Sequence, residues 1–145
     1  MTIKHLLEQK GHDVWTIDPD ATVFDALAKM AEKDIGSLIV MDDEKLIGII
    51  TERHYSRNVI LKGKTSPTTL VKDIMERNVI HIRPELSVEL AMALMTEKRV
   101  RHLPVVENIK VIGLVSIGDL LKFIISKKEF DIGQLEHYIQ GGIAA

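Results

Sequence analysis

The chain has 145 residues and a formal net charge of −2, and its composition already excludes several classes of protein. Hydrophobic residues make up 46% and charged residues 28%, as in a soluble globular domain with a substantial core. The near-neutral charge argues against a broad basic surface for nucleic acid or an anionic membrane, and 4% aromatic content argues against a base-stacking platform. Cysteine is absent, so disulfides, thiolate metal sites and cysteine nucleophiles are excluded.

The hydropathy pattern gives no sign of a membrane or secretory segment. No apolar run approaches the roughly 18 residues that a membrane-spanning helix needs. The first fifteen residues are interrupted by charged side chains such as Lys4, Glu8 and Asp13, which is unlike a secretory signal. We therefore expect a cytoplasmic protein that does not contact membranes.

The chain repeats itself at an offset of 65 residues. When residues 14–55 are aligned with residues 79–120, 14 of 42 positions are identical without a gap, against about one in fifteen by chance. One such unit is too small to bury a core well. We therefore expect two halves that pack on each other with pseudo-twofold symmetry.

Each repeat begins with the signals of a short strand and a helix. Strands are expected at 14–18 and 79–83, and a proline follows each of them. The helices that come next have Thr22 and Ser87 as candidate N-caps. Apolar residues recur at i, i+3, i+4 and i+7 in both helices, which is typical of an amphipathic helix against a core.

Each repeat continues with a hairpin and a second helix. Two apolar runs around a polar turn predict hairpins over 37–50 and 102–115. The closing helices are expected to start after Thr51 and Ser116, whose hydroxyls can cap them. The predicted fold class is therefore α/β (α+β), with two β-α-β-β-α repeats.

The pattern also predicts how the chain is divided. The second repeat is separated from the first by a polar stretch that contains Gly63 and Pro67, which is typical of a linker. The predicted division is a first repeat at 8–62, a linker at 63–73, a second repeat at 74–127 and a C-terminal helix or tail at 128–145.

Known catalytic motifs are missing from the chain. It has no Gly-x-Ser-x-Gly elbow, no His-Glu-x-x-His pair, no P-loop and no Gly-x-Gly-x-x-Gly fingerprint. The six histidines are not placed at metal-ligand spacing. We therefore predict no catalytic residue and no metal site, and we expect a protein that is not an enzyme.

The most informative positions lie where each hairpin leads into its second helix. Thr51 and Ser116 end the hairpins, and His54 and Asp119 follow three residues later, one helical turn on. A helix N-terminus suits a phosphate group, and a carboxylate beside it can accept hydrogen bonds from both ribose hydroxyls. Alternatively, Ser116 and Asp119 form only a capping box, which stabilises the helix by about 1 kcal/mol. The spacing leaves both interpretations open.

The duplicated pattern of proline, helix, hairpin and Gly-h-h-Thr/Ser-x-x-Asp resembles a pair of cystathionine-β-synthase (CBS) domains, also called a Bateman module. The run Arg-His-Leu-Pro-Val-Val at residues 101–106 is similar to the second-strand signature of that family. The resemblance covers about residues 8 to 127. It implies the CBS-pair fold, two clefts between the repeats, and an adenosyl ligand: AMP first, then ADP, ATP, NAD(H) or S-adenosylmethionine.

The resemblance also implies roles for individual residues. Asp119 matches the ribose-binding aspartate, and Arg101 and His102 match a pair of basic residues that contacts phosphate. Because adjacent strand residues point to opposite faces, we expect Arg101 to face the Asp119 cleft and His102 to lie closer to the Thr51 cleft. The complete predicted set of ligand-binding residues is Val14, Trp15, Gly36, Ser37, Thr51, Arg53, His54, Arg57, Val79, Ile80, Val100, Arg101, His102, Pro104, Ser116 and Asp119.

The first-repeat cleft departs from the family pattern. His54 stands where an aspartate is usual, and a neutral imidazole cannot accept hydrogen bonds from both hydroxyls of a diol as a carboxylate does. Arg53 and Arg57, about one helical turn apart, are candidates for binding a diphosphate instead. The alternative is that both arginines are solvated helix residues.

Two functions are consistent with these features. The first is a non-catalytic regulatory module that binds an adenosyl ligand and signals to an unidentified partner protein by conformational or oligomeric change. The alternative is an interaction scaffold whose nucleotide clefts have degenerated. Residual apolar side chains at helical spacing predict a homodimer with a helix-on-helix interface. These side chains belong to Tyr55, Val59, Leu120 and Phe123.

Overall fold

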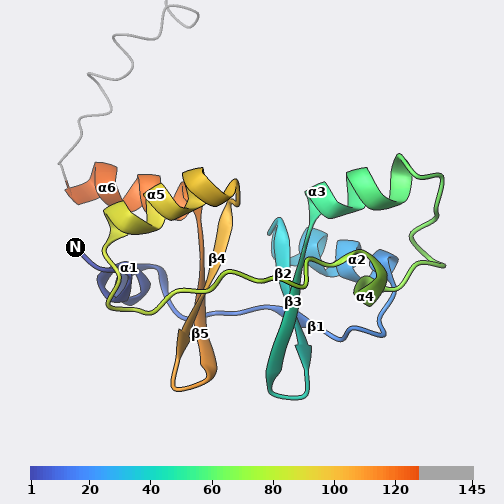
Figure 1. The fold of residues 1–145 in the computed structure, drawn as a ribbon, viewed down its shortest axis with the longest axis horizontal. Coiled ribbons are helices and arrows are strands. Elements are labelled where there is room, and N and C mark those ends of the chain that lie inside the picture. The colour runs from blue at the N-terminus through green and yellow to red at the C-terminus, as the bar shows by residue number, and fades with distance from the viewer. Residues whose placement is uncertain (128–145) are drawn as a thin grey trace, which may run out of the picture.

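The computed structural model describes residues 1–127, so the tail helix expected at 128–145 lies outside the described residues. The elements in chain order are α1 (Ile3–Lys10), β1 (Thr16–Ile17), α2 (Val23–Lys33), β2 (Ser37–Asp42), β3 (Lys45–Thr51), α3 (Glu52–Tyr55), the π-helix η1 (Ser56–Ile60), α4 (Val71–Ile74), α5 (Val88–Lys98), β4 (His102–Glu107), β5 (Lys110–Ser116) and α6 (Ile117–Lys127). They form two lobes that lie side by side (Figure 1). Among residues 1–127, no helix is both long enough and apolar enough to cross a bilayer.

The two lobes carry the same hairpin, as the sequence repeat predicts. Strands β2 and β3 pair antiparallel, and β4 and β5 pair in the same way. The register of each hairpin shifts at the equivalent place, between Val40 and Met41 in the first and between Val105 and Val106 in the second. The mixed α+β class and the duplication are therefore confirmed.

The helices α2 and α5 begin at the predicted caps. The hydroxyl oxygens of Thr22 and Ser87 each accept a backbone N–H three residues on, both at 3.1 Å. This bond satisfies one of the donors that every helix N-terminus leaves without an intrahelical partner. Local sequence alone is sufficient to place these two helix starts.

The first strand of the second repeat is shorter than predicted. In the first repeat, β1 pairs parallel with β2, and Ile39 donates its N–H to the carbonyl of Trp15 at 3.2 Å. The residue equivalent to Ile39 is Pro104, which has no N–H to donate. Only a single bridge between Ile82 and Val105 remains where a strand over 79–83 was expected.

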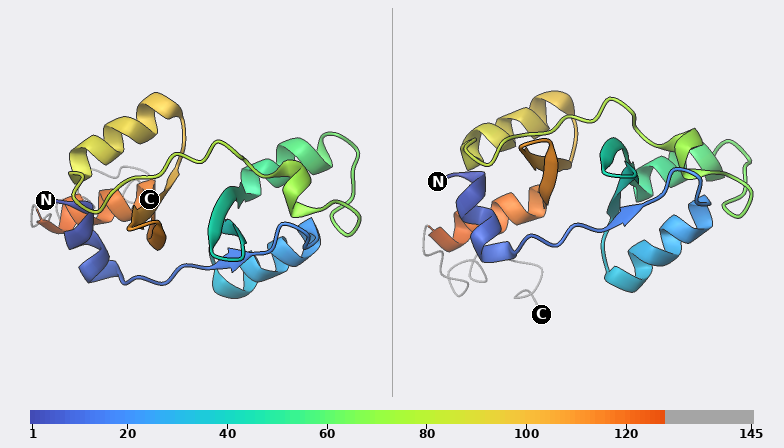
Figure 2. Two further views of the ribbon diagram at one scale, coloured as in Figure 1. Left: turned by 60° about the horizontal axis from the view of Figure 1, so that its bottom comes forward. Right: turned by 90° about the horizontal axis from the view of Figure 1, so that it is seen from below.

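Two short helices cross over from one repeat to the other (Figure 2). The backbone N–H of Ile3, the first residue of α1, donates to the carbonyl of Leu86 in the second repeat at 2.9 Å. Three α1 side chains, those of Ile3, Leu6 and Leu7, are buried in the second-repeat core. In the same way, α4 contributes Val71 and Ile74 to the first-repeat core. Neither helix was predicted, because their docking partners are distant in sequence.

The apolar residues expected to form a dimer surface are part of the two cores. Val59, Leu120 and Phe123 are buried, and Tyr55 packs against the first-repeat core. These four side chains therefore do not support the predicted homodimer, because they are already covered within their own lobes. The apolar side chains that α6 does expose are Leu121 and Ile125, at 45% and 46%.

Candidate functional site

A cavity of about 390 Å³ lies between the two repeats. It draws residues from the end of α1 and the segment after it, from the start of β2, and from the second hairpin with the helix that follows it. Its lining residues are Lys10, Gly11, Asp13, Trp15, Asp34, Ile35, Gly36, Ser37, His102, Leu114, Ser116 and Asp119. No single repeat contains it, so the cavity depends on how the two halves dock.

Asp119 is held in place at the N-terminus of α6. Its Oδ2 accepts the backbone N–H of Ser116 at 2.8 Å, and its own N–H donates to Ser116 Oγ at 3.1 Å. This is the capping box that the sequence offered as one of two interpretations. The same carboxylate also lines the cavity, so the capping role and a ligand-binding role are compatible.

Lys10, at the end of α1, forms an ion pair with the same carboxylate. Its Nζ lies 2.6 Å from Asp119 Oδ2 and also donates to the carbonyl of Leu114. Burial by itself would raise the pKa of Asp119, but the hydrogen bonds from Lys10 and Ser116 outweigh it and hold that pKa below its usual value. Neither bond engages Oδ1 among the described residues, so this oxygen can accept a bond from a ligand.

His102, not Arg101, faces this cavity, which reverses the predicted assignment of the two basic residues. His102 pairs across the hairpin with Ser116, and directly opposed residues in an antiparallel pair point to the same face of the sheet. Burial lowers the pKa of His102, and the nearby Asp119 carboxylate only partly opposes this. The imidazole is therefore neutral at pH 7.

The opposite wall of the cavity comes from the first repeat. Trp15 is 37% exposed there, and the Lys33 ammonium lies 4.3 Å from its ring centroid as a cation–π contact. Beside it, buried Ser37 begins β2 and Gly36 immediately precedes this strand. Together they provide an apolar surface and unobstructed backbone, which suit a planar base.

A second pocket, of about 360 Å³, lies on the other side of the junction. It is lined by Arg53, Met95, Thr96, Arg99, Val100, Arg101 and Ile117. Arg101 therefore points away from Asp119 and lies with Arg53 of α3 and Arg99, the C-cap of α5. Arg57, expected to act with Arg53, is not among the lining residues.

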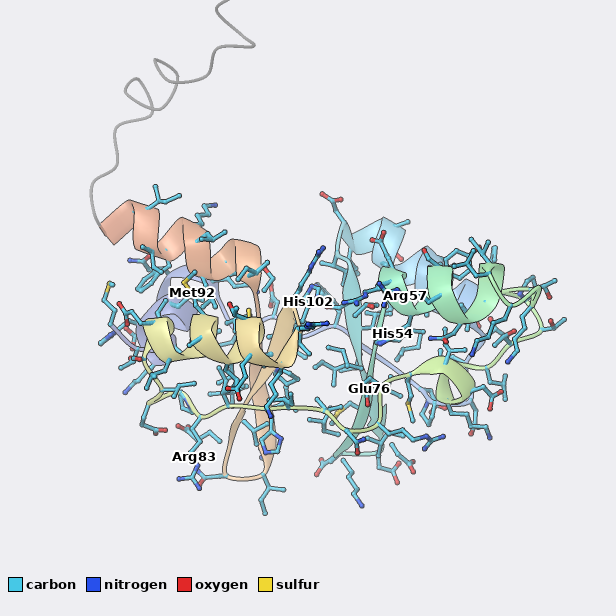
Figure 3. All side chains as sticks on the ribbon, turned by 45° about the horizontal axis from the view of Figure 1, so that its top comes forward. His54, Arg57, Glu76, Arg83, Met92 and His102 are labelled. Atoms are coloured by element: carbon cyan, nitrogen blue, oxygen red, sulfur yellow. The ribbon has the colours of Figure 1, made fainter. Side chains whose placement is uncertain are left out.

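His54 takes over the capping role of the aspartate that it replaces. Its Nδ1 accepts the backbone N–H of Thr51 at 3.0 Å, so the ring proton is on Nε2. Burial lowers the pKa of His54; Glu76 opposes this shift, while Arg53 and Arg57 add to it. Figure 3 shows His54 and His102 on the facing sides of the two lobes, with Arg57 and Glu76 close to His54. His54 lines neither of the two pockets, so the histidine that replaces the usual aspartate acts here as a helix cap.

Other predicted positions serve the fold around the pockets. Pro104 is buried in β4, and Ile80 packs against the second-repeat core. Neither of the two pockets described above is lined by the predicted residues Val14, Thr51, His54, Val79, Ile80 or Pro104. Several lining residues were not predicted from the sequence. They are Lys10, Gly11, Asp13, Asp34, Ile35 and Leu114 in the cavity, and Met95, Thr96, Arg99 and Ile117 in the second pocket. The alignment of the two repeats contains a signal for Asp34 and Arg99, because these equivalent positions carry side chains of opposite charge.

The described residues 1–127 contain no group of three or more His, Asp or Glu side chains arranged to hold a metal ion. The candidate site is instead a cavity of about 390 Å³ between two duplicated α+β halves, with one ionised carboxylate at a helix N-terminus. That combination defines a module of two tandem repeats with a cavity between them.

Comparisons with known proteins assign the family. The CBS domain family model matches residues 10–60 and 71–126, so the chain belongs to this family and carries two CBS domains in tandem. It is 39% identical over 151 residues to the mitochondrial CBS domain-containing protein CBSX3 of Arabidopsis thaliana, covering 97% of this chain and 73% of that protein.

Solved structures agree with this assignment. The crystal structure of a CBS domain protein matches at 54% identity with a TM-score of 0.83, covering 86% of this chain and 98% of that one. A protein with CBS domains from Burkholderia ambifaria MC40-6 matches at 43% identity with a TM-score of 0.87, covering 91% and 99%. The family resemblance of the motifs and the predicted fold class are thus confirmed.

Proposed function

We propose that this protein is a non-catalytic regulatory module that binds an adenosyl ligand in the cavity between its repeats. The observation that carries the proposal is the Asp119 carboxylate. It is ionised, its Oδ1 has no partner among the described residues, and it lies opposite the Trp15 and Gly36 wall. Such a carboxylate can accept a ribose hydroxyl while the base lies against the other repeat.

The family context supports the ligand class. A CBS domain pair with the same fold, at a TM-score of 0.77 and 24% identity, was crystallised with 5′-methylthioadenosine and S-adenosyl-L-methionine. A role in signal transduction has been suggested for the Burkholderia relative. We extend both properties to this chain as hypotheses, with AMP, ADP, ATP, NAD(H) and S-adenosylmethionine as the ligands to test.

Trp15 provides a direct assay because it is the only tryptophan in the chain and lines the cavity. We expect its fluorescence to change on titration with at least one of these ligands. Asp119→Asn keeps an oxygen for the Ser116 N–H but loses the charge, and should weaken binding about tenfold. The matched control is His54→Asn, at the equivalent position of the other repeat, which should leave this affinity unchanged. No fluorescence response to any of the ligands at millimolar concentration would refute the proposal.

A ligand in this cavity would contact both lobes and α1 at once, which is how binding could be passed on to a partner. Lys10 ties α1 to the carboxylate that the ribose would use, so ligand binding and the position of α1 are coupled.

We also propose a homodimer, supported now by the exposed Leu121 and Ile125 on α6 and by relatives that form hexamers. Light scattering should give twice the 16.3 kDa chain mass. The cytoplasmic location stays a prediction.

The alternative function is an interaction scaffold with degenerate clefts. The replacement of the usual aspartate by His54 is the observation that favours it, since this change removes the carboxylate from one of the two clefts. The two functions differ in their response to nucleotide. The scaffold is favoured if the amount of captured partner protein does not change with any adenosyl ligand and Trp15 fluorescence does not respond to any of them.

A further inference from the structure

The internal duplication allows the two pockets to be compared position by position. Asp34 and Arg99 are equivalent, because each is the C-cap of an 11-residue helix and each has a left-handed backbone, with φ of 54° and 56°. Gly36 and Arg101 are also equivalent. The carbonyl of each accepts the N–H of the residue that opens the helix directly after the hairpin of its repeat, at 3.2 and 2.9 Å. The two repeats therefore have equivalent backbone conformation and hydrogen bonding at these positions, but they carry different side chains.

The consequence is that the two pockets carry opposite charge. The cavity is lined by three carboxylates and one ammonium, from Asp13, Asp34, Asp119 and Lys10. The ammonium is already paired with Asp119, and His102 is neutral at pH 7. The second pocket is lined by three guanidinium groups and no acidic side chain, from Arg53, Arg99 and Arg101. Within residues 1–127, none of these three arginines forms an ion pair.

Three unpaired guanidinium groups around one hollow are suited to an anion with several oxygens. Each guanidinium is planar and always charged, and it can donate two parallel hydrogen bonds to one phosphate group. A phosphate in the cavity would instead meet an excess of carboxylates, and like charges a few ångströms apart repel. Val100 and Ile117, together with Met95 and Thr96, complete the lining of the arginine pocket.

We propose that the two pockets divide their ligands by charge. The arginine pocket binds a polyanion of the pyrophosphate class, and the cavity binds an adenosyl group whose 5′ substituent is uncharged or cationic. The assignment for the cavity rests on the proposed function, whereas the assignment for the arginine pocket does not.

The arginine pocket is tested with pyrophosphate and tripolyphosphate alone, by isothermal titration calorimetry at about 50 mM salt, where screening is weak. The variant is Arg99→Asp combined with Arg101→Gly, which installs the residues of the other repeat on the same backbone. A thermal melt checks that it folds. We expect the wild type to bind and the variant to bind at least tenfold more weakly. Absence of wild-type binding at millimolar concentration, or equal binding by both proteins, would overturn the assignment.

The same titration distinguishes free polyphosphate from a nucleotide tail. If ADP and ATP bind more tightly than the matching polyphosphates and lose affinity in the same variant, a nucleotide is the source of the anion. If they bind equally, the pocket recognises the polyphosphate alone. Both results support a polyanion pocket. The polyanion pocket is contradicted if polyphosphate does not bind and if ATP binds the variant as tightly as the wild type.

The cavity is tested by following Trp15 fluorescence with adenosine and AMP. We expect wild-type protein to bind adenosine about tenfold more tightly than AMP, because the three lining carboxylates outnumber the two cations at the cavity, Lys10 and the Lys33 ammonium over Trp15. Asp34→Arg should reduce or reverse that preference, and Arg99 shows that arginine is compatible with this backbone. AMP binding as tight as adenosine in the wild type would overturn the charge assignment of the cavity.

Failure of this proposal can be told apart from failure of the proposed function. In one outcome, Trp15 fluorescence does not respond to any ligand, while the wild type binds polyphosphate and the variant does not. This outcome refutes the proposed function and supports the arginine pocket. A Trp15 response to adenosine without any polyphosphate binding refutes the arginine pocket and leaves the proposed function standing.

Discussion

Two glycines, one in each hairpin, make room for the segments that cross between repeats. A Cβ at Gly48 would lie 2.5 Å from Met75 Sδ and 3.0 Å from the carbonyl oxygen of Glu76. A Cβ at Gly113 would lie 2.7 and 2.9 Å from the two terminal methyl groups of Leu7 in α1. These distances are shorter than an ordinary carbon contact of about 3.5 to 4.0 Å, so alanine at either position forces its neighbours to move.

The two alanine substitutions should differ in how much stability they remove, because the groups that clash with the added Cβ differ in how easily they can move. The Glu76 backbone is bonded to Ile49 in both directions, at 2.9 and 3.0 Å, so it cannot retreat without loss of this bridge. The Leu7 methyl groups can move by rotation of a side chain, although the core around them is packed. We expect Gly48→Ala to lower the free energy of unfolding by about 2–3 kcal/mol and Gly113→Ala by about 1–2 kcal/mol. In a chain of this size, each kcal/mol lowers Tm by roughly 3 °C.

Urea unfolding of the two variants at pH 7.5 measures these differences. Gly36→Ala is the matched control, because a Cβ there meets only Glu52 Oε1 at an ordinary 3.6 Å, and its effect should stay within about 0.5 kcal/mol. Combining Gly113→Ala with Leu7→Ala should cost about 1 kcal/mol less than the sum of the two single changes, since the clashing methyl groups are gone. Equal stability of Gly48→Ala and Gly36→Ala, or strict additivity with Leu7→Ala, would refute this packing argument.

Two further predictions concern titration. The pKa of His54 is lowered by burial, so its contribution to stability is present above about pH 6.5 and is lost as the pH falls through the lowered value. His54→Asn should therefore lose less unfolding free energy than the wild type between pH 7.5 and 5.5, and parallel curves would contradict the assignment. Lys10→Met removes the ion pair of Asp119. NMR titration should show the pKa of that carboxyl rising, because burial is then opposed only by Ser116, and unchanged titration would contradict the pairing. With the Lys10 side chain 36% exposed, the loss of stability at pH 7 should stay below about 1 kcal/mol.

The sequence by itself determined the elements whose causes are local. The caps at Thr22 and Ser87, the two hairpins and their polar turns all depend on residues a few positions apart. The duplication was visible for the same reason, since a fixed offset aligns equivalent local patterns. The capping pair of Ser116 and Asp119 was found in this way, although its spacing could not tell a cap from a binding site.

Tertiary structure decided which groups those elements bring together. Lys10 reaches Asp119 across 109 positions of sequence, and no local pattern encodes where α1 docks. Because Arg101 and His102 are adjacent in an extended segment, they were expected to face opposite ways, but only the pairing of His102 with Ser116 showed which residue faces the cavity. The charge of each pocket follows from the docking of the two repeats, because side chains from both halves meet there and neither half contains the site alone.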